Sequence, residues 1–329
     1  MSIAAFWILA AMLAMYVLLD GYDLGVAAIS PFVSRKDDER VATMRSIEPF
    51  WNGNEVWLIA AGGVLFALFP KAYASAFSGF YLPLMAVLWL LMFRGIAIEL
   101  RSHFPSTIWH EFWDACFSCA SALLIVLFGV ALGNLLRGVP LDASGYFQGT
   151  FAFLLNPYSL GVGLFALIVL AFHGAAFLIV RVDGAPANRA RALLPRLWIL
   201  VAATYFAMTA VTVWTHSGSV SANPALFIVA LFSITALVVE RMAMARKADL
   251  ATFFASTAFL ASLLVAAAGT IFPYVLPAYP VREAGISIFA ASPPSSGLAV
   301  TIAVTVTGLV VVIAYSAVVW RQLAGKIRV

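Results

Sequence analysis

The sequence contains nine long runs of apolar residues, most of them close to the length of a membrane-spanning helix. A helix crosses the hydrocarbon core of a bilayer with about 20 predominantly apolar residues. The first run has no basic segment before it and no clear cleavage site, so we interpret it as a helix and not as a signal peptide. The predicted spans are Ile3–Phe32, Asn54–Phe69, Phe77–Leu100, Phe112–Leu136, Pro157–Val180, Ala192–Trp214, Pro224–Glu240, Leu250–Phe272 and Gly297–Trp320.

Composition indicates that lipid is the main solvent of this chain. Hydrophobic residues make up 64% of the 329 residues and charged residues 10%, whereas a soluble domain is about half apolar and a quarter charged. No hydrophilic stretch is long enough for a separate soluble domain, so we expect one all-α polytopic membrane domain over residues 1–329. The basic residues responsible for the net charge of +4 lie between the apolar runs and not on one patch. We therefore attribute them to membrane topology and expect no nucleic-acid partner.

The basic residues are divided unequally between the two sets of loops. Sixteen of the 19 Lys and Arg residues lie on one side of the nine predicted spans, and the other side carries Lys71, Arg137 and Arg282. Cytoplasmic loops carry the excess of Lys and Arg. We therefore expect a periplasmic N-terminus and a cytoplasmic C-terminus, and the clean division also supports the number of spans.

Ionisable and amide side chains occur near the cytoplasmic ends of the first three predicted spans. A charge at the bilayer centre costs about 3 kcal/mol on insertion scales, so residues that persist there are candidates for function. If the first helix continues through Gly21, its two aspartates lie on one face; Gly21 could instead loosen the helix there. The candidate residues are Asp20, Asp23, Asn52, Asn54, Glu55, Arg94 and Glu99, with the aromatic residues Trp51 and Trp57 beside them.

Two interpretations of these polar residues remain open from chemistry alone. Carboxylates grouped with amides and one arginine can carry protons inward from the cytoplasm. The same residues can instead form a buried polar clamp that fixes how the helices pack. We give the two interpretations equal weight.

Histidine and cysteine residues do not suggest a cofactor bound by this chain. Because several haems need several axial ligands, a single histidine well inside a span, His173, is better interpreted as a hydrogen-bond partner between helices. Cys116 and Cys119 have C-x-x-C spacing, but a zinc site needs about four ligands, so we expect them to pack between helices and predict no metal site. The remaining histidines, near span ends or in loops, are His103, His110 and His216.

Several segments of the chain resemble subunit II of cytochrome bd-type quinol oxidases. Asp20–Gly25 (DGYDLG) is similar to the N-terminal signature of that family, and Arg45–Trp57 (RSIEPFWNGNEVW) to its next characteristic segment. The resemblance extends over essentially the whole chain and is most specific in the first hundred residues. The further segments, in family order, are Ala61–Gly63, Phe69–Pro70, Ala76–Pro83, Phe93–Gly95, Gly133–Pro140, Leu155–Pro157 and Ile271–Pro277.

This resemblance implies a haem-free subunit in a heterodimer of the bacterial cytoplasmic (inner) membrane. The larger partner, subunit I, would carry the quinol site and the haems of types b and d, and the complex would oxidise quinol and reduce dioxygen to water. Subunit II would support the partner and supply part of a proton pathway from the cytoplasm. The resemblance leaves open a bound quinone, a small accessory subunit and membership of the cyanide-insensitive branch.

One position departs from the family pattern. Many members carry an acid directly after the motif tryptophan, and it is assigned to the proton pathway, whereas here this position is Asn52, which does not titrate. Glu55, one helical turn further on, could supply the acid, or Asp20 and Asp23 could do so. A third possibility is that the subunit contributes only water and amides at this point.

The alternative function is a proton-coupled secondary transporter. The position of the polar residues toward one side of the membrane, and not at its midplane, disfavours this alternative.

Overall fold

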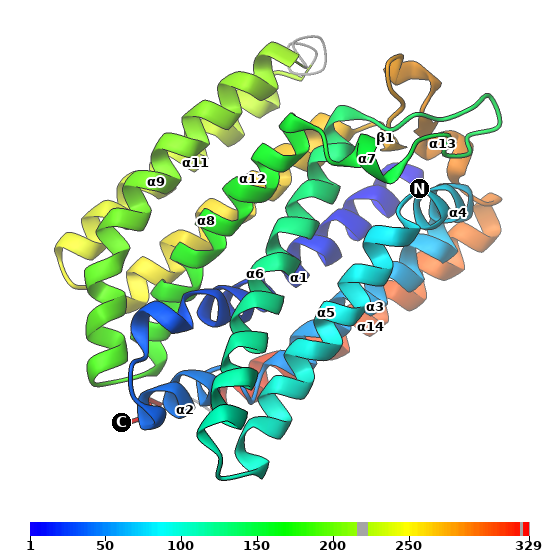
Figure 1. Cartoon of the computed structure of the whole chain (residues 1–329). Coiled ribbons are helices and arrows are strands. Elements are labelled where there is room, and N and C mark those ends of the chain that lie inside the picture. The colour runs from blue at the N-terminus through cyan, green and yellow to red at the C-terminus, as the bar shows by residue number, and fades with distance from the viewer. Residues whose placement is uncertain (216–222, 323–324, 329) are drawn as a thin grey trace.

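The computed structural model describes residues 1–215, 223–322 and 325–328, so His216 lies outside the described part of the chain. Within that part, nine long helices run between two ends of the molecule, which confirms the predicted all-α fold (Figure 1). The termini lie at opposite ends. The long helices are α1 (Ser2–Val33), α3 (Trp51–Leu68), α5 (Tyr81–Leu100), α6 (Thr107–Arg137), α8 (Pro157–Arg181), α9 (Ala185–Thr215), α11 (Ala225–Ala245), α12 (Asp249–Ile271) and α14 (Ser295–Gln322).

Eight of these described helices have both the length and the apolar composition of a membrane span. The remaining one, α3, takes the place of the second predicted span. Its 18 residues give a length of about 27 Å, and Asn52, Asn54 and Glu55 make its first turns polar. The nine predicted runs therefore correspond to nine long helices, of which α3 is short and polar at its beginning.

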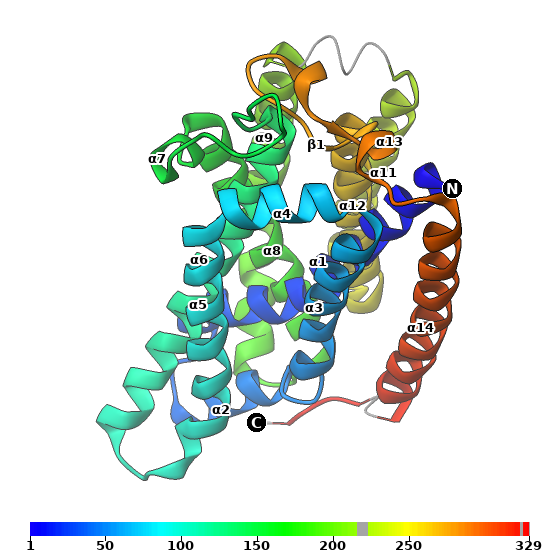
Figure 2. The same cartoon turned by 90° about the vertical axis from the view of Figure 1, so that its right-hand side faces the viewer.

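Short elements cover both ends of the bundle (Figure 2). One end, which we call the basic end, carries α2 (Asp37–Arg45), η1 (Arg101–His103) and the C-terminal residues 325–328. The opposite end carries the N-terminus and an antiparallel pair of short strands. We did not predict these elements, because each is too short to show hydrophobic periodicity. The elements at the opposite end are α4 (Pro70–Gly79), α7 (Phe151–Leu154), β1 (Tyr274–Leu276), η2 (Arg282–Ala284), β2 (Ile286–Ser287) and α13 (Ile288–Ala291).

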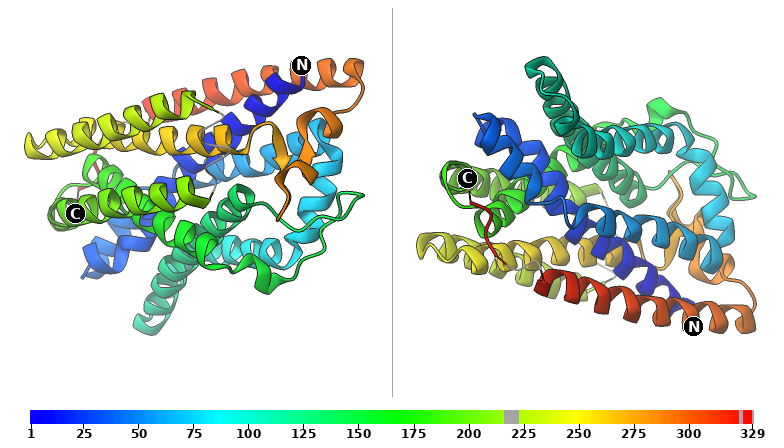
Figure 3. Two further views of the ribbon diagram at one scale, coloured as in Figure 1. Left: turned by 90° about the horizontal axis from the view of Figure 1, so that it is seen from above. Right: turned by 90° about the horizontal axis from the view of Figure 1, so that it is seen from below.

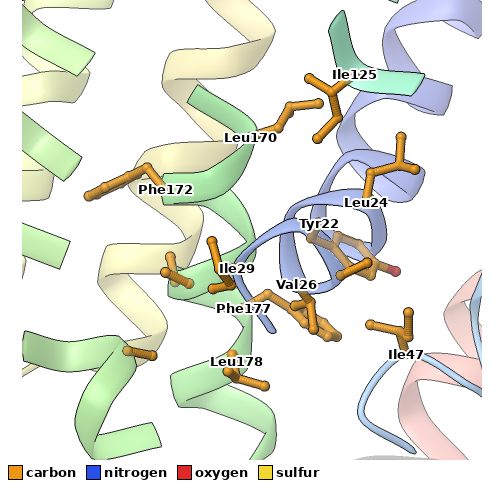
Figure 4. Close-up of a cluster of buried hydrophobic side chains, with 14 of the residues drawn as sticks. Tyr22, Leu24, Val26, Ile29, Ile47, Ile125, Leu170, Phe172, Phe177 and Leu178 are labelled. Atoms are coloured by element: carbon orange, nitrogen blue, oxygen red, sulfur yellow. The ribbon is translucent and has the colours of Figure 1, made fainter. Parts of the chain in front are cut away.

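The helices α1 and α8 approach each other at the level of their backbones. A Cβ atom added to Gly25 would lie 2.0 Å from the carbonyl oxygen of Leu170, and one added to Gly174 would lie 2.2 Å from the carbonyl carbon of Gly25. Small residues allow membrane helices to approach at the level of their backbones. Beside this contact the rings of Tyr22 and Phe177 stack with centroids 4.1 Å apart, within the apolar cluster of Figure 4. By contrast, α14 lies along one edge of the molecule (Figure 3).

Ion pairs fasten α2 to the basic end of the bundle. Arg189 at the start of α9 donates to Glu39 of α2 at 2.6 Å, and the backbone N–H of Arg35 donates to the same carboxylate at 2.7 Å. These hydrogen bonds, the one from Arg189 first among them, lower the pKa of the Glu39 carboxyl to about 2. The Glu39 carboxylate therefore connects α2 to α9, and it stays ionised at neutral pH.

Candidate functional site

Five of the predicted polar residues come together where α1, α3 and α5 meet. Arg94 of α5 is fully buried. Its Nη2 donates to Oδ1 of Asp20 on α1 at 2.8 Å, and its Nη1 donates to Oε1 of Glu55 on α3 at 2.9 Å. Oδ2 of Asp23 lies 4.0 Å from the same guanidinium. One arginine thus contacts carboxylates from two other helices, which we call the acidic cluster: Asp20, Asp23, Asn54, Glu55 and Arg94.

Asn54 of α3 ties the second aspartate of α1 into the acidic cluster. Its Nδ2 donates to Oδ2 of Asp23 at 2.7 Å and to the hydroxyl oxygen of Tyr22 at 3.0 Å. We did not predict a role for Tyr22, although it lies inside the DGYD segment. Because an amide donates hydrogen bonds without carrying a charge, Asn54 holds the carboxylate without neutralising it.

The helix geometry explains why the two aspartates of α1 lie on the same face. The helix runs without interruption from Ser2 to Val33, so Gly21 does not loosen it. Asp20 and Asp23 are three residues apart and so lie on one face. The absence of a side chain at Gly21 lets Leu170 of α8 approach, since a Cβ there would lie 3.0 Å from Leu170 Cδ2.

The members of the acidic cluster differ in their access to the surface. The side chains of Asp20, Asp23 and Arg94 are wholly buried, whereas that of Glu55 is 21% exposed. Glu55 therefore links the buried carboxylates to the outside of the chain. With three carboxyl groups around one guanidinium, full ionisation would leave an excess of negative charge in a buried place, so the acidic cluster is chemically suited to hold protons.

Several buried polar atoms around the acidic cluster have no hydrogen-bond partner within the described chain. They include one oxygen of Asp20, one of Asp23 and Nε of Arg94. The hydroxyl of Tyr16 and the indole N–H of Trp57 are in the same condition on α1 and α3. Buried polar groups of this kind are usually satisfied by ordered water, which is also the medium through which protons move between side chains.

The other predicted site residues take different positions. Asn52 and Glu99 are exposed and lie outside the acidic cluster. Glu99 is five residues beyond Arg94 on α5, which places it on a different face of the helix. Trp51 packs against the α5 backbone, because a Cβ at Gly95 would lie 3.3 Å from its ring.

His173 lies in the core between three helices. Its Nδ1 is 2.7 Å from the hydroxyl of Ser256 on α12, and its Nε2 is 3.2 Å from the carbonyl oxygen of Leu18 on α1. Both ring nitrogens thus serve interhelical hydrogen bonds, as the sequence interpretation expected. Cys116 and Cys119 of α6 are free cysteines, the first partly buried and the second exposed.

Comparison with known proteins gives a consistent family assignment. The family model for cytochrome bd terminal oxidase subunit II matches residues 1–323. The chain is 32% identical to the cytochrome bd-I ubiquinol oxidase subunit 2 of Escherichia coli K12, over 98% of this chain and 94% of that protein. It is 31% identical to the cytochrome bd ubiquinol oxidase subunit 2 of Bacillus subtilis, over 69% of this chain and 68% of that protein.

A solved structure shares the fold over almost the full length. It is the bd oxidase of Geobacillus thermodenitrificans, with a TM-score of 0.80, 19% identity and coverage of 98% of both chains. The family match covers the acidic cluster and all nine long helices. The chain therefore belongs to the family of cytochrome bd terminal oxidase subunit II.

Proposed function

We propose that this chain is the haem-free subunit of a quinol:oxygen oxidoreductase in the bacterial inner membrane. It supports a haem-bearing subunit I, which holds the haems b and d and oxidises quinol. The acidic cluster takes up protons from the cytoplasm for the reduction of oxygen to water. The basic end then faces the cytoplasm, in agreement with the positive-inside rule.

The observation that carries this proposal is the arrangement of three carboxyl groups around Arg94. Asp20 and Asp23 are buried, and Glu55 reaches the surface from the same guanidinium. A proton that enters at Glu55 can be passed to the buried aspartates, because the shared arginine keeps all three carboxyl groups close together. A purely structural clamp would use Asp20 and Glu55, which accept hydrogen bonds from Arg94, and it would not need the third acid, Asp23, 4.0 Å from the same guanidinium.

The proposal also accounts for the asparagine in the motif. Asn52 is exposed on the first turn of α3, and Glu55 lies one turn further on. At 1.5 Å per residue, the two positions differ by about 4.5 Å along the helix. Glu55 thus supplies a titrating group close to the place where other family members carry the acid.

The variant Glu55→Gln tests the proton role. The amide oxygen can still accept the hydrogen bond from Arg94, but it does not carry a proton at neutral pH. We expect oxygen consumption by the assembled complex to fall about tenfold, as for the loss of a proton-transfer group, while the haem spectrum stays unchanged. Glu111→Gln is the matched control, because Glu111 is an exposed acid of α6 outside the acidic cluster.

Each outcome has a distinct meaning. Normal oxygen consumption in Glu55→Gln contradicts the proton role of Glu55. Loss of the haem spectrum in the same variant shows a failure of assembly and assigns Glu55 to the structural clamp. If Glu111→Gln loses as much activity, the effect comes from the overall charge of the basic end, and this result also contradicts the proposal.

A further inference from the structure

The last residue of α6, Arg137, carries a positive charge that no acid of the described chain neutralises. Its side chain is partly buried, and its Nη1 is covered by other atoms yet has no hydrogen-bond partner within the described residues. None of the ion pairs formed among these residues includes Arg137. A covered donor without an acceptor is costly, so we expect an acceptor from outside the chain.

Two aromatic rings hold the guanidinium of Arg137 in place. Its Cζ lies 4.6 Å from the ring centre of Phe153 and 4.3 Å from that of Tyr279. The two ring centres are 5.7 Å apart. The faces of both rings attract the cation, but they carry no counter-charge. The rings therefore orient the guanidinium and leave its charge available to an anion.

Hydrogen bonds to α6 and to the residues that follow it fix the positions of both rings. Asn134 of α6 donates from Nδ2 to the carbonyl oxygen of Leu154 at 2.8 Å, which holds α7 and the neighbouring Phe153. The backbone N–H of Tyr279 donates to the carbonyl oxygen of Val139 at 3.0 Å. The surroundings of Arg137 are thus built by the fold and do not depend on a ligand.

A hollow lined by apolar residues lies on the same face of α6 as Arg137. The residues of α6 that line it precede Arg137 by six, seven and ten positions, a spacing that places all four side chains on one face of a helix. The start of α5 and the residues of α7 close the other sides of the hollow. The lining residues of α6 are Leu127, Val130 and Ala131.

The two features lie at the depths of a lipid headgroup and of its acyl chains. The predicted apolar run Phe112–Leu136 has its centre at Leu124. Arg137 lies about 20 Å from this centre along the helix, and Ala131 lies about 10 Å from it. With its headgroups, half a bilayer is about 20 Å thick, and the hydrocarbon of one leaflet is about 15 Å thick. A phosphate thus reaches Arg137 at the level where an acyl chain reaches the hollow.

We propose that Arg137 and the hollow bind one phospholipid in the leaflet at the opposite end. A phosphate oxygen accepts the hydrogen bond from Nη1 and supplies the missing negative charge, and one acyl chain lies in the hollow. Arginine suits this role because its planar guanidinium matches the geometry of a phosphate. A free phosphate ion has the same chemistry at Arg137, but it leaves the apolar hollow without a role.

The test measures lipid binding to the purified complex after bound lipid has been removed by detergent exchange. The complex is titrated with dioleoyl phosphatidylglycerol and followed by native mass spectrometry. We expect the affinity of the tightest site to fall about tenfold in Arg137→Gln, as for the loss of a charge-assisted hydrogen bond. The matched control is Lys71→Gln, which removes an exposed charge of the same end and should leave the affinity unchanged.

Two further titrations distinguish a phospholipid from a free phosphate. Dioleoylglycerol has the same chains without the phosphate, and we expect it to bind the wild-type complex about tenfold more weakly. Ala131→Phe fills the hollow, and we expect it to weaken phosphatidylglycerol about tenfold, because each CH2 group removed from apolar contact weakens binding about fourfold. Inorganic phosphate should bind this variant and the wild-type complex equally.

Three results would overturn the proposal. One is an equal affinity of the wild type and Arg137→Gln for phosphatidylglycerol, and another is an equal affinity of the wild type for dioleoylglycerol. The third is an affinity for phosphatidylglycerol that Ala131→Phe leaves unchanged, which would assign Arg137 to a free anion. The last two measurements keep Arg137, so they decide the question even if Arg137→Gln does not assemble. All of these measurements follow binding, so their outcome is independent of the proton role of the acidic cluster.

Discussion

Replacement of Gly25 by alanine would add a methyl group where the backbones of α1 and α8 approach each other. The added Cβ would lie 2.0 Å from the carbonyl oxygen of Leu170 and 2.9 Å from the backbone nitrogen of Gly174. Both are backbone atoms of α8, so no side-chain rotation relieves the clash. A C···O contact needs about 3.3 Å, so α1 and α8 must separate locally by about 1.3 Å.

The separation would also disturb contacts around the glycine pair. The hydrogen bond of His173 to Leu18 and the stacking of Tyr22 on Phe177 both join α1 to α8. Overpacking costs about 1–3 kcal/mol in a packed core, and a clash with the backbone at two residues of α8 places this variant at the upper end of that range. The gain in helix propensity from glycine to alanine, at most about 1 kcal/mol, does not compensate.

The assay is thermal unfolding of the purified complex in detergent, followed by intrinsic tryptophan fluorescence. At about 2–4 °C per kcal/mol for chains of 150–250 residues, we expect a midpoint lowered by roughly 5 °C. Gly308→Ala is the control, because an added Cβ on α14 meets no atom within 4 Å. Equal midpoints for Gly25→Ala and Gly308→Ala would refute the close approach of α1 and α8.

Two further predictions concern charged groups. Arg94→Gln leaves the buried Asp20 without its cation, and breaking a buried ion pair costs about 3–5 kcal/mol. We therefore expect a low yield of assembled complex, which a second substitution in the same chain, Asp20→Asn, partly restores. Equal yields from Arg94→Gln and from the double variant would contradict this pairing. Glu39 has its pKa lowered to about 2 by Arg189, so its contribution to stability is complete above its ordinary value of 4.5 and is lost as the pH falls toward 2. The difference in unfolding midpoint between wild type and Glu39→Gln should therefore shrink below about pH 4.5, and a constant difference would rule out this pairing.

The long helices were predictable because hydropathy alone marks them. Each of the nine apolar runs corresponds to a long helix, and the predicted ends differ from the observed ones by at most seven residues. The short elements that cap the opposite end, such as α4 and the β1–β2 pair, were not predictable. Their positions depend on contacts between segments distant in the sequence, such as the parallel bridge between Val139 and Ala278.

The position of the polar residues along their helices could be predicted, but the direction of their side chains could not. Arg94 and Glu99 are both near the basic end of α5, yet the first is buried in the acidic cluster and the second is exposed. Two exposed positions among the candidates, Asn52 and Glu99, show that apolar runs alone do not tell which face of a helix is covered.

Glu240 illustrates the opposite error. The seventh predicted span, Pro224–Glu240, ends at this residue. In the structure α11 continues to Ala245 and buries the carboxyl group. Only the packing of α11 against its neighbours shows this burial. A span boundary drawn at a charged residue can therefore hide a buried carboxyl group.

The measurement that tests the central claim most directly is the optical spectrum of this chain after purification, alone and with the protein that accompanies it. The account predicts one-to-one co-purification with a second membrane subunit, which carries all the haem, and a spectrum without haem for this chain alone. Haem bound to the isolated chain, or a stable chain that purifies with no haem-bearing partner, would contradict the account.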